Sequence, residues 1–134
     1  GKKGCLEQYA SATGIARLAR IRLAKNNDMT LLRGQEITAK AVFDALKEGD
    51  KVAEEIVEEF GAYLGYALAD VAAVIDPSMF IIGGGVSKAG PIIIQYVKKY
   101  FLEKAFFANE GTEFIIAVLG NDAGICGAAK LILG

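Results

Sequence analysis

The sequence has 134 residues, with no histidine, two prolines and two cysteines, and these shortages narrow what it can be. Without histidine, the chain alone has no imidazole to act as a catalytic base. Cys5 and Cys126 stand near opposite ends, in no spacing typical of metal ligands, so this chain by itself cannot form a zinc site. Because no repeat, low-complexity tract or linker interrupts the pattern, we expect one cooperative unit.

Long apolar runs and an excess of one charge are also lacking. No stretch of about 18 apolar residues could span a bilayer, and no apolar segment of a signal peptide follows Gly1, so we expect a cytoplasmic protein with no membrane partner. The chain has 15 Lys and Arg against 16 Asp and Glu, and no basic stripe. This balance argues against nucleic acid as a partner, because phosphate binding requires clustered cations.

Hydrophobic residues make up 53% of the chain, enough to fill a core, and most of them follow helical spacing. Residues 51–75 repeat apolar side chains at i, i+3, i+4 and i+7, and Asp76-Pro77 must end that helix. Thr38 and Asp50 are good N-caps for the second and third helices. We expect helices that begin after Gly14, after Thr38, at Lys51, at Pro91 and at Ala123, the first three ending before Asn26, near Glu48 and at Ile75.

Two short apolar runs indicate strands. Residues 79–82 form a continuous apolar run, which fits a strand buried on both faces of a parallel sheet. Residues 113–119 predict a second strand, so the fold class is α/β. Two strands alone cannot make a covered parallel sheet. We therefore expect further strands upstream of Gly1, and the start at Gly rather than Met suggests a fragment or processed product.

Three glycines, Gly83-Gly84-Gly85, follow the first predicted strand directly. Glycine lets backbone N–H groups approach a ligand without a Cβ in the way, and a helix N-terminus after the strand would favour phosphate. Neither the Walker nor the Rossmann pattern matches. A tight turn at the sheet edge is the alternative, but the triple glycine favours nucleotide binding.

Four further glycines lie inside predicted helices, where each costs about 1 kcal/mol relative to alanine. For Gly61 and Gly65, packing of two helices is the favoured explanation. For Gly124 and Gly127, backbone packing and ligand binding stay equally open. Asp122 would cap the last helix or, as the less favoured alternative, help to hold a metal-nucleotide.

The N-terminal segment carries Cys5 and Glu7, which alone are weak signals. A single cysteine is usually a small inert hydrophobe, and a single glutamate a solvated side chain. Cys126, in an apolar helix, has the same interpretation. A local basic group is more typical of a solvated helix face than of an anion site, and it consists of Arg17, Arg20, Arg22 and Lys25.

Taken together, three ordered motifs resemble the ROK family of sugar kinases and repressors, and within it the bacterial glucokinases. Residues 1–7 are similar to the second half of the family signature Cys-x-Cys-Gly-x-x-Gly-Cys-x-Glu, and residues 11–14 continue it. Residues 76–87 resemble the adenosine-side motif, and residues 121–129 complete the pattern. The resemblance covers essentially the whole chain.

This resemblance implies an actin-like, ribonuclease-H-like kinase of two lobes, with residues 1–134 forming most of the C-terminal lobe. The implied reaction is ATP-dependent phosphorylation of the 6-hydroxyl of a hexose, glucose first, with Mg²⁺. Glu7 would accept hydrogen bonds from sugar hydroxyls, and Cys5 would be one thiolate of a structural zinc site that fixes the loop carrying Glu7. The ATP site would be lined by Gly83, Gly84, Gly85 and Ser87.

The sequence departs from the family pattern where it begins. The family's catalytic Asp, its other sugar-binding residues and its remaining zinc ligands belong upstream of residue 1, so no catalytic residue is assigned. We expect the chain alone to be inactive, because phosphoryl transfer needs the base, Mg²⁺ and both substrates positioned together. Two alternatives stay open: a sugar-sensing repressor, or a kinase for fructose or N-acetylmannosamine. Apolar composition and the family's habit of dimerising favour a homo-oligomer.

Overall fold

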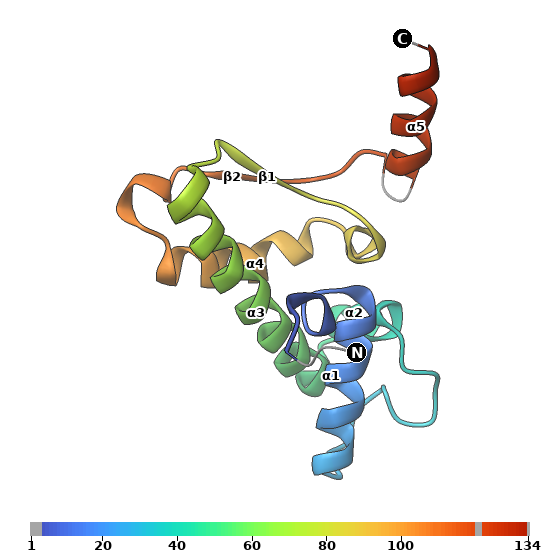
Figure 1. Cartoon of the computed structure of the whole chain (residues 1–134). Helices are drawn as coiled ribbons and strands as arrows, with labels where there is room; N and C mark the ends of the chain where they lie inside the picture. Colours follow the sequence, from blue (N-terminus) through green and yellow to red (C-terminus); the bar gives the residue numbers. More distant parts are fainter. Residues whose placement is uncertain (1–3, 120–121, 134) are drawn as a thin grey trace.

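The computed structural model describes residues 4–119 and 122–133 and is a helix-rich α/β arrangement (Figure 1). Short 3₁₀ helices connect the larger elements: η1 (Leu6–Gln8), η2 (Gly85–Ala89) and η3 (Phe107–Asn109). The larger elements are α1 (Ala12–Lys25), α2 (Ala39–Lys47), α3 (Lys51–Ile75), β1 (Met79–Ile82), α4 (Ile92–Lys104), β2 (Glu113–Ile116) and α5 (Ala123–Leu133).

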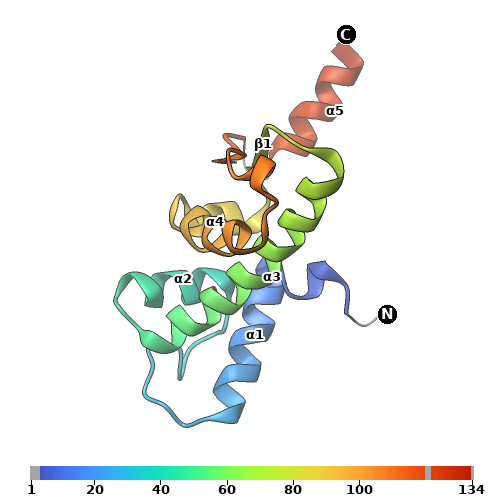
Figure 2. The same ribbon diagram turned by 90° about the vertical axis from the view of Figure 1, so that its left-hand side faces the viewer.

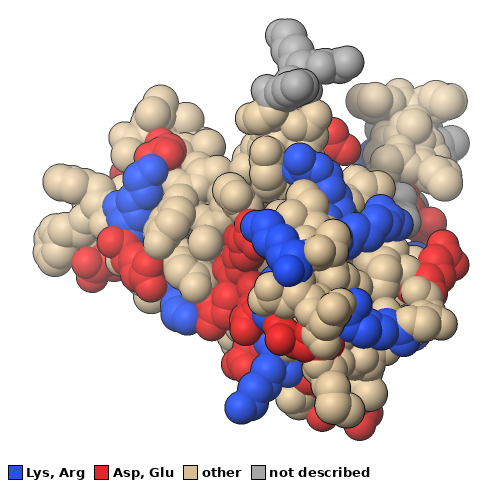
Figure 3. Space-filling view, turned by 90° about the horizontal axis from the view of Figure 1, so that it is seen from below, with Lys and Arg blue, Asp and Glu red and all other residues tan. Residues whose placement is uncertain are grey.

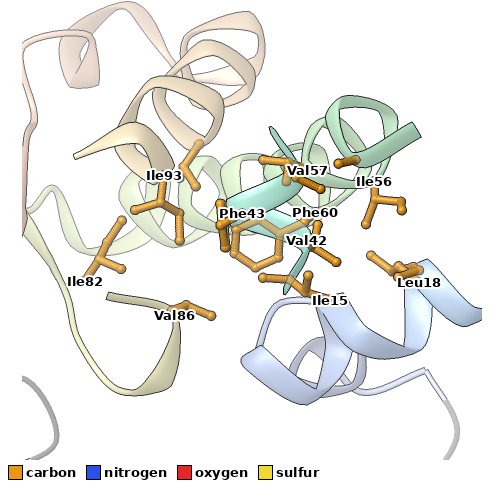
Figure 4. Packing of buried hydrophobic residues seen from close by; sticks show 14 of the residues in the cluster. Ile15, Leu18, Val42, Phe43, Ile56, Val57, Phe60, Ile82, Val86 and Ile93 are labelled. Carbon is orange, nitrogen blue, oxygen red and sulfur yellow. The ribbon is translucent and has the colours of Figure 1, made fainter. Parts of the chain in front are cut away.

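The long helix α3 is the centre of the core, because α1, α2 and α4 all pack against it. Phe60 of α3 is fully buried, and side chains from the three neighbouring helices point toward the same interior (Figure 4). Ile82 and Val86, at the end of β1 and in η2, join this cluster. The glycine segment between them is therefore held by apolar contacts on both sides.

Polar side chains start each of the first three helices. Thr38 Oγ1 accepts a hydrogen bond from the N–H of Ala41 at 3.1 Å, and Asp50 Oδ1 accepts one from Ala53 at 3.0 Å, so both predicted caps are confirmed. Ser11 Oγ accepts from the N–H of Gly14 at 3.0 Å. This cap starts α1 at Ala12, earlier than the spacing of apolar residues suggests.

The close packing of α3 against α4 depends on two glycines. An added Cβ at Gly65 would lie 2.6 Å from the carbonyl oxygen of Val97, and one at Gly61 would lie 3.0 Å from that of Tyr96. Helix packing, the favoured explanation for these glycines, is confirmed. Ion pairs join the same helices at Glu58–Lys99 and Asp70–Lys104, each at 2.7 Å.

The two strands pair in parallel, from Met79 opposite Glu113 to Ile82 opposite Ile116. One face of this pair packs on α4, where the ring of Phe114 lies 5.0 Å from that of Phe101. On the other face Ile81 is 62% exposed. Burial of β1 on both faces is therefore wrong for the described residues, because none of their elements covers the outer face. The predicted extension of the second strand to residue 119 is also wrong, since β1 turns into the glycines after Ile82.

Helix α5 begins at Ala123, as the sequence predicts, but it projects away from the other helices (Figure 2). Ile125, Leu131 and Ile132 are between 72% and 88% exposed. Apart from the neighbouring residues and the backbone of α5 itself, no described atom lies within 4 Å of a Cβ added at Gly124 or Gly127, so the close approach expected there is not found among the described residues.

Among the helices that the structure describes, none is both long and apolar enough to cross a membrane.

The Gly65→Ala substitution tests the contact between α3 and α4. Alanine favours the helix by about 1 kcal/mol, but the clash with the α4 backbone opposes this gain. We expect a net loss of about 1–3 kcal/mol in the free energy of unfolding, measured by urea denaturation. Gly111→Ala is the control, because nothing lies within 4 Å of an added Cβ there. Equal stability of the two variants would contradict the packing role.

Asp50 links stability to pH. Partial burial opposes its ionisation, but hydrogen bonds from the N–H groups of Ala53 and Leu31 and from the Thr30 hydroxyl outweigh this and hold its pKa below the ordinary value. Its stabilising contribution is therefore present above the unfolded-state pKa and is lost as pH falls through the lower folded-state pKa. We expect Asp50→Ala to cost about 1–2 kcal/mol near neutral pH.

The same difference should shrink as the pH falls below about 3.9, the ordinary pKa of an aspartate in an unfolded chain. Urea denaturation of both proteins from pH 3 to 7 measures it. Asp50→Asn, which keeps a capping side chain, should lose less at neutral pH. A difference that stayed constant over this range would show that ionised Asp50 contributes nothing specific.

Candidate functional site

The glycine segment forms an open loop where β1 ends. Gly84 has φ 73° and ψ −159°, a conformation that side chains other than hydrogen rarely allow. Ser87 fastens the loop, since its hydroxyl donates to the Gly84 carbonyl at 2.7 Å and its N–H donates to the same oxygen at 3.2 Å. Apart from Gly84 itself and the two adjacent residues, no described atom lies within 4 Å of a Cβ added at Gly84. The backbone therefore has an open side that a ligand could approach.

The element after the glycines differs from the expectation. Residues 85–89 form the short 3₁₀ helix η2, and Pro91 is the N-cap of α4. The predicted helix start at Pro91 is confirmed to within one residue, but η2 and Gly90, at φ 79°, separate the N-terminus of α4 from the three glycines. Any anion at this loop would meet glycine backbone and η2 rather than the first turn of a long helix.

A pocket of about 270 Å³ lies between α2 and η2, next to the glycine loop. Its apolar part includes Phe43, whose side chain is 3% exposed. Its charged part comes from both elements. The lining residues are Ala39, Lys40, Phe43, Asp44, Lys47, Gly85, Lys88 and Ala89. The α2 residues of the pocket could not be identified from the sequence, because their spacing is also that of an ordinary amphipathic helix.

Positively charged side chains outnumber negatively charged ones around this pocket. Asp44 pairs with Lys40 at 2.5 Å and with Lys47 at 3.8 Å, and the hydrogen bond from Lys40 holds the pKa of Asp44 below its ordinary value. Lys88 forms no ion pair with any carboxylate in the described part of the chain. Three lysines against one aspartate leave the pocket positive, which suits an anionic ligand.

A second pocket, of about 490 Å³, surrounds the segment with Glu7. Glu7 lies in η1 and is exposed. The lining also includes Gly4, Gln8, Tyr9, Thr13, Gly14 and Arg17. We call this the Glu7 pocket, and the one between α2 and η2 the α2–η2 pocket.

The fold brings the glycine loop to the element that follows Glu7. A Cβ added at Gly85 would lie 3.1 Å from the Cβ of Ala12, the first residue of α1. Val86 and Ile15 belong to the same buried cluster (Figure 4). The glycine loop and the first residue of α1, 73 positions apart in the sequence, are thus in direct contact, and the short helix η1 that carries Glu7 comes just before α1 in the chain.

The described part of the chain does not assemble a metal site by itself. Among residues 4–119 and 122–133, no group of three or more Cys, Asp or Glu side chains lies close enough together to hold a metal ion. Cys5 is exposed and stands as one thiol, so these residues do not by themselves fit zinc. Asp122 is exposed just before α5, and Asn121 lies outside the described residues.

The basic residues of α1 do more than form a solvated face. Arg22 pairs with Asp28 and Glu55, each at 2.7 Å, and Arg20 donates to the Ile37 carbonyl at 3.0 Å. Basic and acidic side chains are interspersed over the face in Figure 3. Cys126, expected to be an inert hydrophobe, is exposed on α5.

Comparison with known proteins gives a consistent result. The ROK family model matches residues 1–134. The chain is 42% identical to a glucokinase from Halalkalibacterium halodurans, over 98% of this chain and 42% of the relative. It is 32% identical to the DNA-binding transcriptional repressor Mlc of Escherichia coli K12, over 84% of this chain and 30% of the repressor.

Among solved structures, the chain matches a ROK family glucokinase from Streptomyces griseus in complex with glucose and AMPPNP. The TM-score is 0.86 at 36% identity, over 98% of this chain and 45% of that one. The matched protein has an actin-like fold, so the predicted fold class is confirmed. The chain spans less than half the length of each of these relatives.

Two alanine variants of the glycine loop distinguish the effect of backbone strain from the effect of the room available for a methyl group. Gly84→Ala should cost about 1–3 kcal/mol of folding free energy, because an L residue is strained at a φ of 73°. Gly83→Ala should change it by no more than about 0.5 kcal/mol, since its Cβ would make an ordinary 3.4 Å contact with Ala117. Thermal or urea denaturation measures both. A Gly84 variant as stable as the Gly83 variant would refute this account of the loop.

Proposed function

Since this chain belongs to the ROK family, we propose that it is the part of a sugar kinase, a glucokinase, that holds ATP beside the sugar. The observation that carries the proposal is the contact between the glycine loop and α1. It sets a positively charged pocket with an open glycine backbone beside a pocket that contains a carboxylate. A kinase needs its phosphoryl donor and its acceptor hydroxyl at such neighbouring positions.

In this proposal the α2–η2 pocket takes the nucleoside of ATP. Phe43 supplies apolar contact for the base, and Lys88 faces the same space with no carboxylate partner among the described residues. The phosphates then follow the open backbone of Gly83, Gly84 and Gly85, with Ser87 holding the loop in shape. The AMPPNP complex of the S. griseus relative supports ATP as the donor. Mg²⁺ would accompany the phosphates and neutralise charge in the transfer.

Glu7 binds the sugar in this proposal. An ionised carboxylate can accept hydrogen bonds from two adjacent hydroxyl groups, which fixes the orientation of the ring and so of its 6-hydroxyl. Glucose is the proposed sugar because the relatives reported above include glucokinases, one of them solved with glucose. Cys5 lies two positions before Glu7 and would need ligands from elsewhere to hold zinc, so no step of the mechanism is assigned to that metal.

The general base and the rest of the cleft are proposed to lie outside residues 1–134. The chain spans 45% of the S. griseus kinase, and it exposes apolar surface on the outer face of β1 and along α5. Such surfaces fit a larger, two-lobed protein in which further chain covers them. Residues 1–134 alone are then unable to transfer phosphate.

A coupled ADP-release assay tests the function. The protein containing residues 1–134 with its upstream half, purified with zinc retained, should release ADP with glucose faster than with fructose or N-acetylmannosamine. Residues 1–134 alone should show no turnover. Glu7→Gln should raise KM for glucose at least about tenfold, because the neutral amide loses charge-assisted hydrogen bonds, and leave KM for ATP nearly unchanged.

Gly84→Ala provides the reciprocal variant. Its methyl group would lie on the open side of the loop, where the phosphates are proposed to approach, so in the folded variant KM for ATP should rise and KM for glucose should not. Sugar binding without ADP release from any hexose would overturn the kinase proposal in favour of a sugar-sensing repressor. Preference for another hexose would overturn glucose alone.

A further inference from the structure

The segment that carries Glu7 is fastened to the helices by a stack of three side chains. The guanidinium of Arg17, on α1, lies 4.8 Å from the centre of the Tyr9 ring. On α3, Tyr63 contributes a second ring, 4.6 Å from that of Tyr9 and tilted by 39°. Arg17 Nη1 also donates to the carbonyl oxygen of Gln8 at 3.4 Å. We call this group the Arg17 stack.

The segment itself is a single tight turn. The N–H groups of Tyr9 and Ala10 both donate to the Leu6 carbonyl, at 3.0 and 2.8 Å. The N–H of Gly4 donates to the side chain of Gln8 at 3.0 Å. Glu7 therefore lies between groups that are bonded to each other. The backbone position of Glu7 follows the turn as a whole, because hydrogen bonds join the residues on either side of it.

Gly14 brings this turn close to α1. A Cβ at Gly14 would lie 2.7 Å from the backbone carbon and oxygen of Tyr9, so the turn can pack there only against glycine. This contact places the Tyr9 ring within reach of Arg17, one helical turn further along α1. The stack thus acts on a turn that already rests against the helix.

Arg17 differs from the other arginines at this end of α1. Arg22 is engaged by two carboxylates and Arg20 by the Ile37 carbonyl. Arg17 forms no ion pair with any carboxylate that the structure describes. Instead it contacts two consecutive residues of the turn, the carbonyl oxygen of Gln8 and the ring of Tyr9. A planar guanidinium can stack on a ring and donate in its own plane at once, which an ammonium group cannot do.

We propose that Arg17 is a positioning residue for the sugar site: together with Tyr63 it holds the turn at residues 6–9 so that Glu7 faces its pocket. The inference rests on the proposed function, because it takes Glu7 as the group that binds the sugar. It gives the turn an anchor made of this chain's own side chains, separate from any ligand of Cys5. The interpretation of Arg17 as part of a solvated face is then incomplete.

Arg17→Lys in the protein that includes the upstream half is the first test. It keeps the charge and loses the combined stacking and hydrogen bond, so KM for the sugar should rise by roughly tenfold, with KM for ATP within about twofold. Tyr63→Leu should act in the same way. Tyr63→Phe keeps the ring and should behave as the parent protein. Arg20→Lys, on the same helix but bonded to Ile37, is the matched control.

Hydrogen–deuterium exchange gives a readout that needs no sugar. The amides of Tyr9 and Ala10 should exchange faster in the Arg17→Lys and Tyr63→Leu variants, and at the parent rate in Tyr63→Phe and Arg20→Lys. Faster exchange supports the positioning role even where no hexose is phosphorylated, an outcome that would overturn only the proposed function. Unchanged exchange, or equal sugar defects in the Arg17 and Arg20 variants, overturns the positioning role.

Discussion

The packing of three helices on α3 is the constraint on which the rest of the structure depends. Helix α2 holds one wall of the α2–η2 pocket, α1 begins beside the Glu7 pocket, and both rest on the same long helix. Their positions are fixed by fully buried side chains such as Phe60 and Ile56. Because a close-packed core deforms little, the two pockets keep a fixed relation to each other.

Small residues decide how closely this frame can bring backbones together. Gly65 lets α4 lie against α3, and Gly85 lets the loop after β1 rest on Ala12 of α1. Gly85 lines the α2–η2 pocket and Ala12 is followed by Thr13, which lines the Glu7 pocket, so the second contact links the walls of the two pockets. Both contacts are of the same kind, because in each of them glycine leaves room for a neighbouring element that a side chain would displace.

Local chemistry explains which parts of this arrangement could be predicted. The caps Thr38 and Asp50 and the ending of α3 at Asp76-Pro77 depend on groups only a few residues apart, so sequence spacing identifies them. The predicted length of the second strand is wrong, because that length depends on where β1 stops pairing, which is a property of another segment. The α2 wall of the pocket could not be predicted for the same reason, because Lys40 and Lys47 line a pocket only when α2 is packed opposite η2.

The sequence by itself determined the helices, the α/β class and the family, because periodicity, caps and ordered motifs are written in neighbouring residues. Only the tertiary structure decided that the glycine loop rests on α1 and that Arg17 and Tyr63 hold the turn with Glu7. Tyr9 and Tyr63 are far apart along the chain, and their contact arises from how α1 packs on α3. Such pairings depend on helix orientation, which no local pattern encodes.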